Sequence, residues 1–135
     1  MTILRFMAVC FILIFTCSNS HASESRFITK EHIVVDLERQ IEWLRCSVGQ
    51  RWNGNECSGK IVNLSLDMVP KALDIANEQL GGEWRLPSQA ELMSIVCNEC
   101  SSPKIDENIF PNTDNAPYWT SDQSIFNSKF YVSVN

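Results

Sequence analysis

The stretch Trp84–Leu92, WRLPSQAEL, contains the clearest helix start in the chain. Ser88 and Glu91 have the spacing of a capping box, in which each side chain accepts a hydrogen bond from the backbone N–H of the other residue. An apolar stripe follows at helical spacing, formed by Leu92, Ile95 and Val96. The pattern predicts a helix from about Gln89 to about Cys97.

The segment before this stretch predicts another helix, Pro70–Leu80. Proline is tolerated in a first helical turn, where its missing N–H would have no helical partner. Leu73, Ala76 and Leu80 share one face of this helix. Gly81-Gly82 follows, so we expect the helix to end in a left-handed C-terminal cap.

Short strands are predicted on both sides of the helices. Ile33–Val35 and Ile41–Leu44 precede them, with a turn between the two segments. Tyr118–Ser121 and Phe130–Val134 follow them, and Phe110 is the expected buried anchor of the turn-rich connection. The order of strands, two helices and strands predicts an α+β fold, with the helices on a small, mostly antiparallel sheet.

The N-terminus has the layout of a secretory signal peptide, assigned to residues 1–22. Arg5 precedes the apolar run Phe6–Phe15, and small residues lead to cleavage after Ala22. The run is too short to cross a bilayer, so we expect no stable membrane insertion after cleavage. The alternatives are an uncleaved anchor and lipid modification of Cys17. The sequence thus predicts an exported single domain, residues 23–135, in the periplasm or at the cell surface.

The composition argues against several classes of partner. The chain has a net charge of −5, and its acidic residues are spread along the sequence rather than gathered in a block. Nucleic acids and anionic membrane surfaces both require concentrated Lys and Arg. We therefore expect no nucleic-acid partner.

Four cysteines lie outside the predicted signal peptide, at Cys46, Cys57, Cys97 and Cys100. An even number in a small exported chain indicates disulfides, and four cysteines permit three pairings. Local pairing of Cys46 with Cys57 and of Cys97 with Cys100 is favoured. Between the first two, Asn53-Gly54 is a strong turn signal, so Ser47–Ser58 is interpreted as a loop anchored by a tryptophan.

Cys97-Asn98-Glu99-Cys100 also has the spacing of a redox dithiol or of half a zinc site. Reactive cysteines of this kind lie at helix N-termini, whereas Cys97 falls at the expected end of a helix. A four-cysteine zinc site would prefer two such pairs, and Cys46 with Cys57 is not one. A structural disulfide is therefore the favoured interpretation.

Other polar residues give no catalytic or metal set. His32 is the only histidine outside the predicted signal peptide, and nothing nearby resembles a nucleophile elbow. Four loop carboxylates match no calcium-loop motif, namely Asp106, Glu107, Asp114 and Asp122. Glu91 is interpreted as a helix cap rather than a general acid. We therefore expect no catalytic residues, no metal and no cofactor.

Several segments together resemble the Lcl C-terminal domain family, long catalogued as a domain of unknown function. The matching segments are Trp43–Trp52 with Gly54, Cys57 and Gly59; Trp84–Leu92; Ile105-Asp106 with Phe110-Pro111; and Tyr118–Ser121. The resemblance implies an exported or surface domain, and some members bind glycans as adhesins. Arg85–Glu91 is also similar to a helix start in sulfatase-modifying enzymes, which implies a C-type-lectin-like fold without their catalysis.

The chain departs from the family pattern at its C-terminus. Members continue past the strand Tyr131–Val134 into a glycine turn and a final strand, whereas this sequence stops at Asn135. We expect the last strand to be lacking, which leaves an exposed sheet edge. Such an edge would support a homo- or hetero-oligomer, or a structural subunit completed by a partner's strand.

The candidate ligand-binding residues are Trp52, Arg51 and Arg45. A tryptophan can stack on a sugar ring, and Trp52 is the best candidate for exposure among the tryptophans Trp43, Trp52, Trp84 and Trp119. Core packing of these rings and ordinary ion pairing of Arg45, Arg51 and Arg85 are the alternatives. The sequence thus favours a non-catalytic binding or adhesion module for a glycan or an envelope protein. A structural subunit is the second hypothesis and an enzyme the third.

Overall fold

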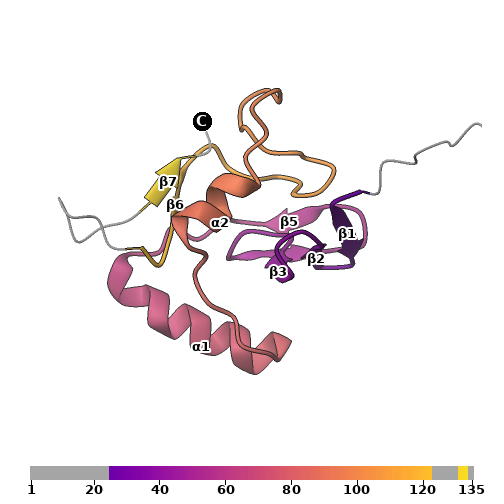
Figure 1. Ribbon diagram of the computed structural model, residues 1–135. Coiled ribbons are helices and arrows are strands. Elements are labelled where there is room, and N and C mark those ends of the chain that lie inside the picture. Colours follow the sequence, from indigo (N-terminus) through magenta and orange to yellow (C-terminus); the bar gives the residue numbers. More distant parts are fainter. Residues whose placement is uncertain (1–24, 123–130, 134–135) are drawn as a thin grey trace, which may run out of the picture.

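The computed structural model describes residues 25–122 and 131–133 (Figure 1). The predicted signal peptide, residues 1–22, lies outside the described residues. The elements run in the order β1 (Phe27–Lys30), β2 (Ile33–Asp36), β3 (Ile41–Leu44), β4 (Gln50–Trp52), β5 (Cys57–Gly59), a 3-10 turn (Leu66–Met68), α1 (Val69–Leu80), α2 (Gln89–Ser94), β6 (Pro117–Trp119) and β7 (Tyr131–Ser133). All paired strands are antiparallel. The predicted α+β class is confirmed.

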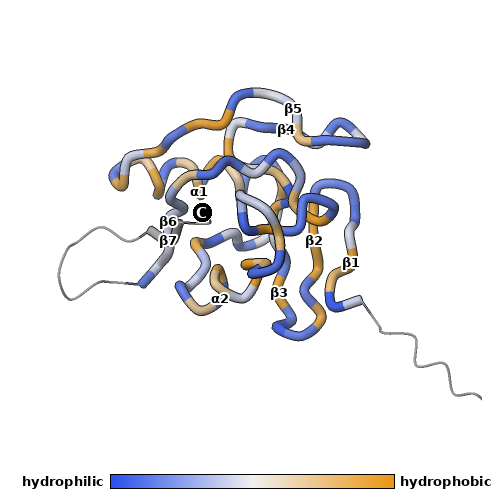
Figure 2. Tube along the Cα trace, turned by 90° about the horizontal axis from the view of Figure 1, so that it is seen from above, coloured by the Kyte–Doolittle hydropathy of each residue, from blue (hydrophilic) through white to orange (hydrophobic). Residues whose placement is uncertain are grey.

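Strands β1, β2 and β3 form a three-stranded sheet in that order. Strand β2 is the most continuously hydrophobic of the three and lies between the other two (Figure 2). Strand β1 was not expected, because Phe27–Lys30 alternates only weakly and most of its residues are exposed. Its pairing with β2, from Phe27 opposite Asp36 to Lys30 opposite Ile33, holds it in place.

The segment interpreted as a loop between Cys46 and Cys57 contains the hairpin β4–β5, with Trp52 opposite Cys57. The Asn53-Gly54 turn is confirmed: the Asn53 side chain accepts hydrogen bonds from the N–H groups of Asn55 and Glu56, at 2.9 and 3.0 Å. The Cys46–Cys57 disulfide ties this hairpin to the end of β3.

Helix α1 confirms the predicted Pro70–Leu80 helix, with Pro70 in its first turn. Its end differs from the expected cap. Gly81 has a positive φ of 71°, but its ψ of 167° is extended rather than left-handed helical. The chain therefore leaves the helix directly, and the Gly81 N–H closes the last turn on the Asn77 carbonyl.

Helix α2 has the predicted capping box but is shorter than predicted. It ends at Ser94, and Ile95 already lies outside it. Val96 then pairs with Ile105 in an isolated antiparallel bridge, and the Cys97–Cys100 disulfide closes the turn between them. The prediction that Cys97 ends the helix is wrong, because this bridge and disulfide require the chain to turn earlier.

Strands β6 and β7 pair antiparallel, with Trp119 opposite Tyr131. They correspond to the predicted strands near Tyr118 and Tyr131, with bounds shifted by a residue or two; Phe130 and Val134 lie outside the described residues. Among the described helices, none has the length and hydrophobicity needed to span a bilayer.

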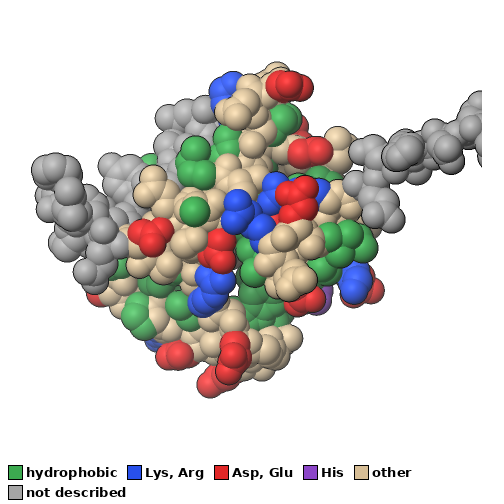
Figure 3. Space-filling view, viewed as in Figure 1, with side chains coloured by type: hydrophobic (Ala, Val, Ile, Leu, Met, Phe, Trp, Pro, Cys, Tyr) green, Lys and Arg blue, Asp and Glu red, His purple; other side chains and the backbone are tan. Residues whose placement is uncertain are grey.

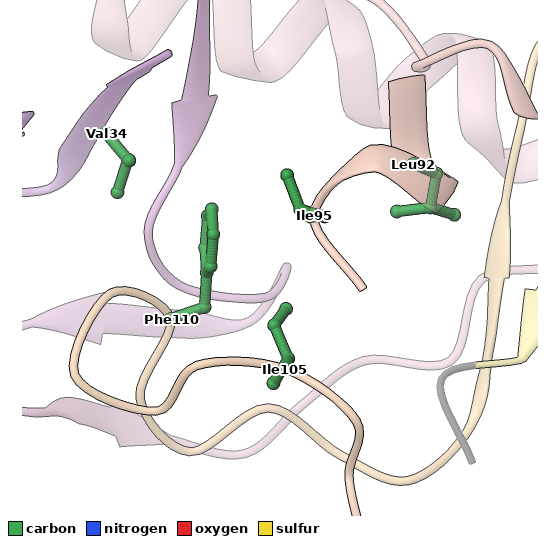
Figure 4. Close-up of a cluster of buried hydrophobic side chains, with 5 residues drawn as sticks. All are labelled: Val34, Leu92, Ile95, Ile105 and Phe110. Atoms are coloured by element: carbon green, nitrogen blue, oxygen red, sulfur yellow. The ribbon is translucent and has the colours of Figure 1, made fainter. Parts of the chain in front are cut away.

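The core lies where the three-stranded sheet meets α2 and the chain after it. Its buried side chains come from β2, α2 and the following connection: Val34, Leu92, Ile95, Ile105 and Phe110 (Figure 4). The rings of Phe27 and Trp43 pack edge-on against Phe110, with centroids 6.1 and 6.4 Å away. The predicted anchor role of Phe110 is confirmed, and helix α1 adds no residue to this cluster.

Candidate functional site

A cleft of about 1030 Å³ lies between α1 and the rest of the described body. One wall is the apolar face of α1, from which Val69, Ala72, Leu73, Ala76 and Leu80 line the cleft. The opposite wall includes Ile33, Trp43, Leu44, Leu86, Leu92 and Trp119. Figure 3 shows hydrophobic side chains in the recess between the lower, helical part of the molecule and the part above it. The cleft is thus largely apolar.

Aromatic side chains are concentrated in this cleft, and two of the indole N–H groups are satisfied by backbone carbonyls. Trp84 Nε1 donates to Gly81 O and Trp119 Nε1 donates to Leu64 O, both at 2.8 Å. Trp43 Nε1 is buried and has no acceptor among the described residues. The first two bonds hold chain segments next to the two ends of α1.

The rim of the cleft carries an ion pair between Arg85 and Glu91. The guanidinium donates to both carboxylate oxygens, at 2.8 and 2.7 Å, and the Ser88 N–H donates to one of them at 2.7 Å. Arg85 and then this N–H lower the pKa of Glu91 to about 2. The Glu91 carboxylate is therefore ionised at neutral pH and acts as a helix cap, as predicted.

Residues 32–135 match the Lcl C-terminal domain family. The chain belongs to the Lcl C-terminal domain family. This confirms the resemblance found in the sequence. No curated protein and no solved structure matches the chain, so the C-type-lectin likeness stays a prediction.

Three of the segments that resemble the Lcl C-terminal domain family each contribute a tryptophan to the cleft, at Trp43, Trp84 and Trp119. The rings lie at the end of β3, in the connection before α2 and in β6. The sequence pattern placed the apolar residues of the first helix on one face, but it indicated no cleft. The signal that could have found it is this face together with tryptophans in three separate segments.

The predicted ligand residues of this Lcl C-terminal domain lie around the β4–β5 hairpin, and two of them, Arg51 and Trp52, lie outside the cleft lining. The Arg45 guanidinium stacks over the half-buried Trp52 ring, 4.0 Å from its centroid. It also donates to the carbonyls of Ile109 and Asn108, at 3.0 and 2.8 Å. Arg51 is exposed on β4, and of these three predicted residues Arg45 alone lines the cleft. Their role in ligand binding stays a prediction.

Two of the other polar candidates, Asp106 and Asp122, accept hydrogen bonds within the fold. Asp106 accepts from the Asn108 backbone and side chain, at 2.9 and 3.0 Å, and Asp122 accepts from the Gln89 N–H. His32 is half-buried, and its carbonyl accepts from the Arg45 N–H. Within the part of the chain that the structure describes, no three His, Cys, Asp or Glu side chains gather as metal ligands.

Proposed function

We propose that this Lcl C-terminal domain is a non-catalytic binding module of the bacterial cell envelope, with its ligand in the cleft beside α1. The cleft volume, about 1030 Å³, carries this proposal. Ligand sites in proteins are concave, mostly apolar and typically several hundred Å³ in volume. An apolar recess of this size gains contacts when a ligand fills it, since its lining atoms otherwise face solvent.

The chemistry near the cleft supports binding rather than catalysis. The Glu91 carboxylate is held by Arg85 and the Ser88 N–H, and its low pKa leaves no proton to donate at neutral pH. The four cysteines of the described chain are in disulfides, so none of them offers a thiolate. The disulfides and the predicted signal peptide both support a location in an oxidising compartment.

A protein ligand is favoured over a glycan by the aliphatic lining from α1 and β3. Glycan binding is the second candidate, and the three cleft tryptophans favour it. Indole rings can stack on sugar rings, as they do in other recognition sites where an apolar body and a polar edge are both needed.

Site-specific photo-crosslinking tests whether the cleft holds the ligand. A photoreactive amino acid replaces Ala76 on the cleft face of α1, and a matched variant carries it at the exposed Asp74 of the same helix. In envelope extract, we expect a discrete adduct from position 76 and none from position 74. The unmodified protein is applied to a glycan array in parallel. Equal adducts at both positions, or no adduct together with no array signal, would refute the proposal.

A further inference from the structure

Strand β3 is an edge strand within the described chain, because it pairs with β2 and no other described strand. The Arg45 N–H donates to the His32 carbonyl, and the register places Ile33 opposite Leu44. In an antiparallel pair, hydrogen-bonded and non-hydrogen-bonded positions alternate. The backbone N–H and C=O groups of Glu42 and Leu44 therefore point away from β2.

This edge borders the cleft. Every residue of Ile41–Leu44 lines it, although successive side chains of a strand point to opposite faces of the sheet. Lining by all four consecutive residues of β3 therefore points to a cavity that runs along the edge of the strand. The apolar face of α1 forms the other wall. An edge strand beside an amphipathic helix is a geometry in which extended peptides bind by adding a strand to the sheet.

The charged residues that line the cleft have a net negative charge, with four carboxylates, Glu42, Glu83, Glu91 and Asp114, against Arg45 and Arg85. Arg85 is paired with Glu91, and Arg45 is held by the Trp52 ring and two carbonyls. The exposed lining residues Glu42, Glu83 and Asp114 have no ion-pair partner among the described residues. A ligand that complements this lining carries Lys or Arg beside its apolar residues.

We propose that an extended apolar peptide segment with basic flanks binds in the cleft by pairing with the free edge of β3. The proposal rests on the proposed function, since it names the ligand class of the same cleft. The N–H and C=O groups of Glu42 and Leu44 bond the peptide backbone. The side chains on one face of the peptide pack against α1, and its basic residues lie near the acidic lining. The four residues of β3 can pair with about 13 Å of extended chain.

Phage display of random dodecapeptides against the purified protein tests this ligand class. We expect enrichment of apolar sequences flanked by Lys or Arg. When the strongest binder is synthesised and added, amide exchange at Glu42 and Leu44 should slow at least tenfold. No enrichment, or protection confined to other amides, would overturn strand addition.

Backbone N-methylation gives a control that leaves the protein unchanged. One version of the peptide is methylated at every second residue, and the other at the alternate residues. In strand addition, only one edge of the peptide backbone forms hydrogen bonds with β3. The version methylated along that edge should therefore lose binding at least tenfold, and the other version less than threefold. Similar behaviour of the two versions would contradict the proposal.

Two substitutions at Glu42 of the protein give the complementary test. Proline is tolerated in edge strands where the missing N–H faces outward, so Glu42→Pro removes one bond to the ligand while β2–β3 pairing remains. We expect Glu42→Pro to bind the peptide at least tenfold more weakly than Glu42→Ala. A glycan-array signal or a position-76 adduct without peptide enrichment would sink this inference and leave the proposed function standing. Absence of all three would sink both.

Discussion

At the scale of single residues, Asp36 is a buried carboxylate that depends on several hydrogen-bond donors. Its side chain is fully buried and accepts from Arg26 through both oxygens, at 3.0 and 2.5 Å. It also accepts from the Glu38 and Arg39 N–H groups. Arg26 in turn donates to the Ser94 carbonyl at 2.8 Å. This network joins the chain before β1, the end of β2 and the end of α2.

Replacement of Asp36 should therefore be costly. Asp36→Asn keeps the shape but leaves Arg26 without its charged partner, so we expect a loss of about 2–4 kcal/mol in the free energy of unfolding. Urea denaturation measures it. The control is Glu38→Gln, because Glu38 pairs with the same arginine but is 68% exposed, and its loss should cost less than about 0.5 kcal/mol. Equal effects of the two substitutions would contradict the network's importance.

The lowered carboxyl pKa values predict acid sensitivity. Hydrogen bonds from Arg85 lower the pKa of Glu91 from 4.5 to about 2, and those from Arg26 lower the pKa of Asp36. The folded state binds fewer protons than the unfolded state, so this stability is complete above pH 4.5 and lost as the pH falls toward 2. Because Arg85 is 59% exposed, solvent screening limits the Glu91 contribution to about 1–2 kcal/mol.

Urea titrations at several pH values between 2 and 6 check this expectation. Glu91→Gln should reduce the slope of stability against pH, whereas Glu107→Gln, at an exposed loop position, should leave it unchanged. If the Glu91→Gln variant had the wild-type slope of stability against pH, Glu91 would not keep its low pKa in solution.

At the scale of elements, α1 and α2 differ in how they are packed. Both Leu92 of α2 and Leu73 of α1 line the cleft, but Leu92 is 6% exposed and belongs to the core cluster, whereas Leu73 is half-buried and lies outside that cluster. Truncation of a well-packed leucine leaves a cavity, whereas truncation at an open cleft removes fewer contacts. We expect Leu92→Ala to cost about 3 kcal/mol and Leu73→Ala about 1 kcal/mol in the free energy of unfolding, measured by urea denaturation. Equal costs would mean that α1 closes onto the core in solution.

The two disulfides should contribute unequally. Cys46–Cys57 spans a sequence separation of 11, and Cys97–Cys100 spans 3. In the chain-entropy account, the longer loop gives about 3 kcal/mol and the shorter about 2 kcal/mol. We expect the double serine variant of the first pair to have the lower midpoint of thermal unfolding. The reverse order would show that the turn after α2 depends more on its disulfide than the hairpin does.

At the scale of the whole molecule, local signals were predictable from the sequence and distant ones were not. The capping box of Ser88 and Glu91 involves neighbours in the chain, and so do the Asn53-Gly54 turn and the local disulfides. Strand β1 depends on β2 for its pairing, so Phe27–Lys30 carries little signal of its own. The early end of α2 depends on the bridge from Val96 to Ile105.

The cleft was unpredictable for the same reason. The apolar stripe of α1 indicates burial against something, but the distance between this helix and the sheet depends on contacts far apart in the sequence. Trp119 and Leu64 provide one of them, a hydrogen bond across 55 residues. The sequence shows tryptophans in the family segments, but that Trp43, Trp84 and Trp119 line one recess follows only from the fold.

The Trp119–Leu64 bond makes the position of α1 testable. Trp119→Phe keeps an aromatic ring in β6 and leaves the Leu64 carbonyl without its donor, a loss of about 1 kcal/mol. Amide exchange in α1 should then accelerate about fivefold, since 1.4 kcal/mol corresponds to a factor of ten. Trp84→Phe is the matched control, because its indole bonds Gly81 within the same turn and does not tie α1 to β6. If both variants accelerate amide exchange in α1 equally, or neither does, the hydrogen bond from Trp119 to Leu64 does not hold α1 in place.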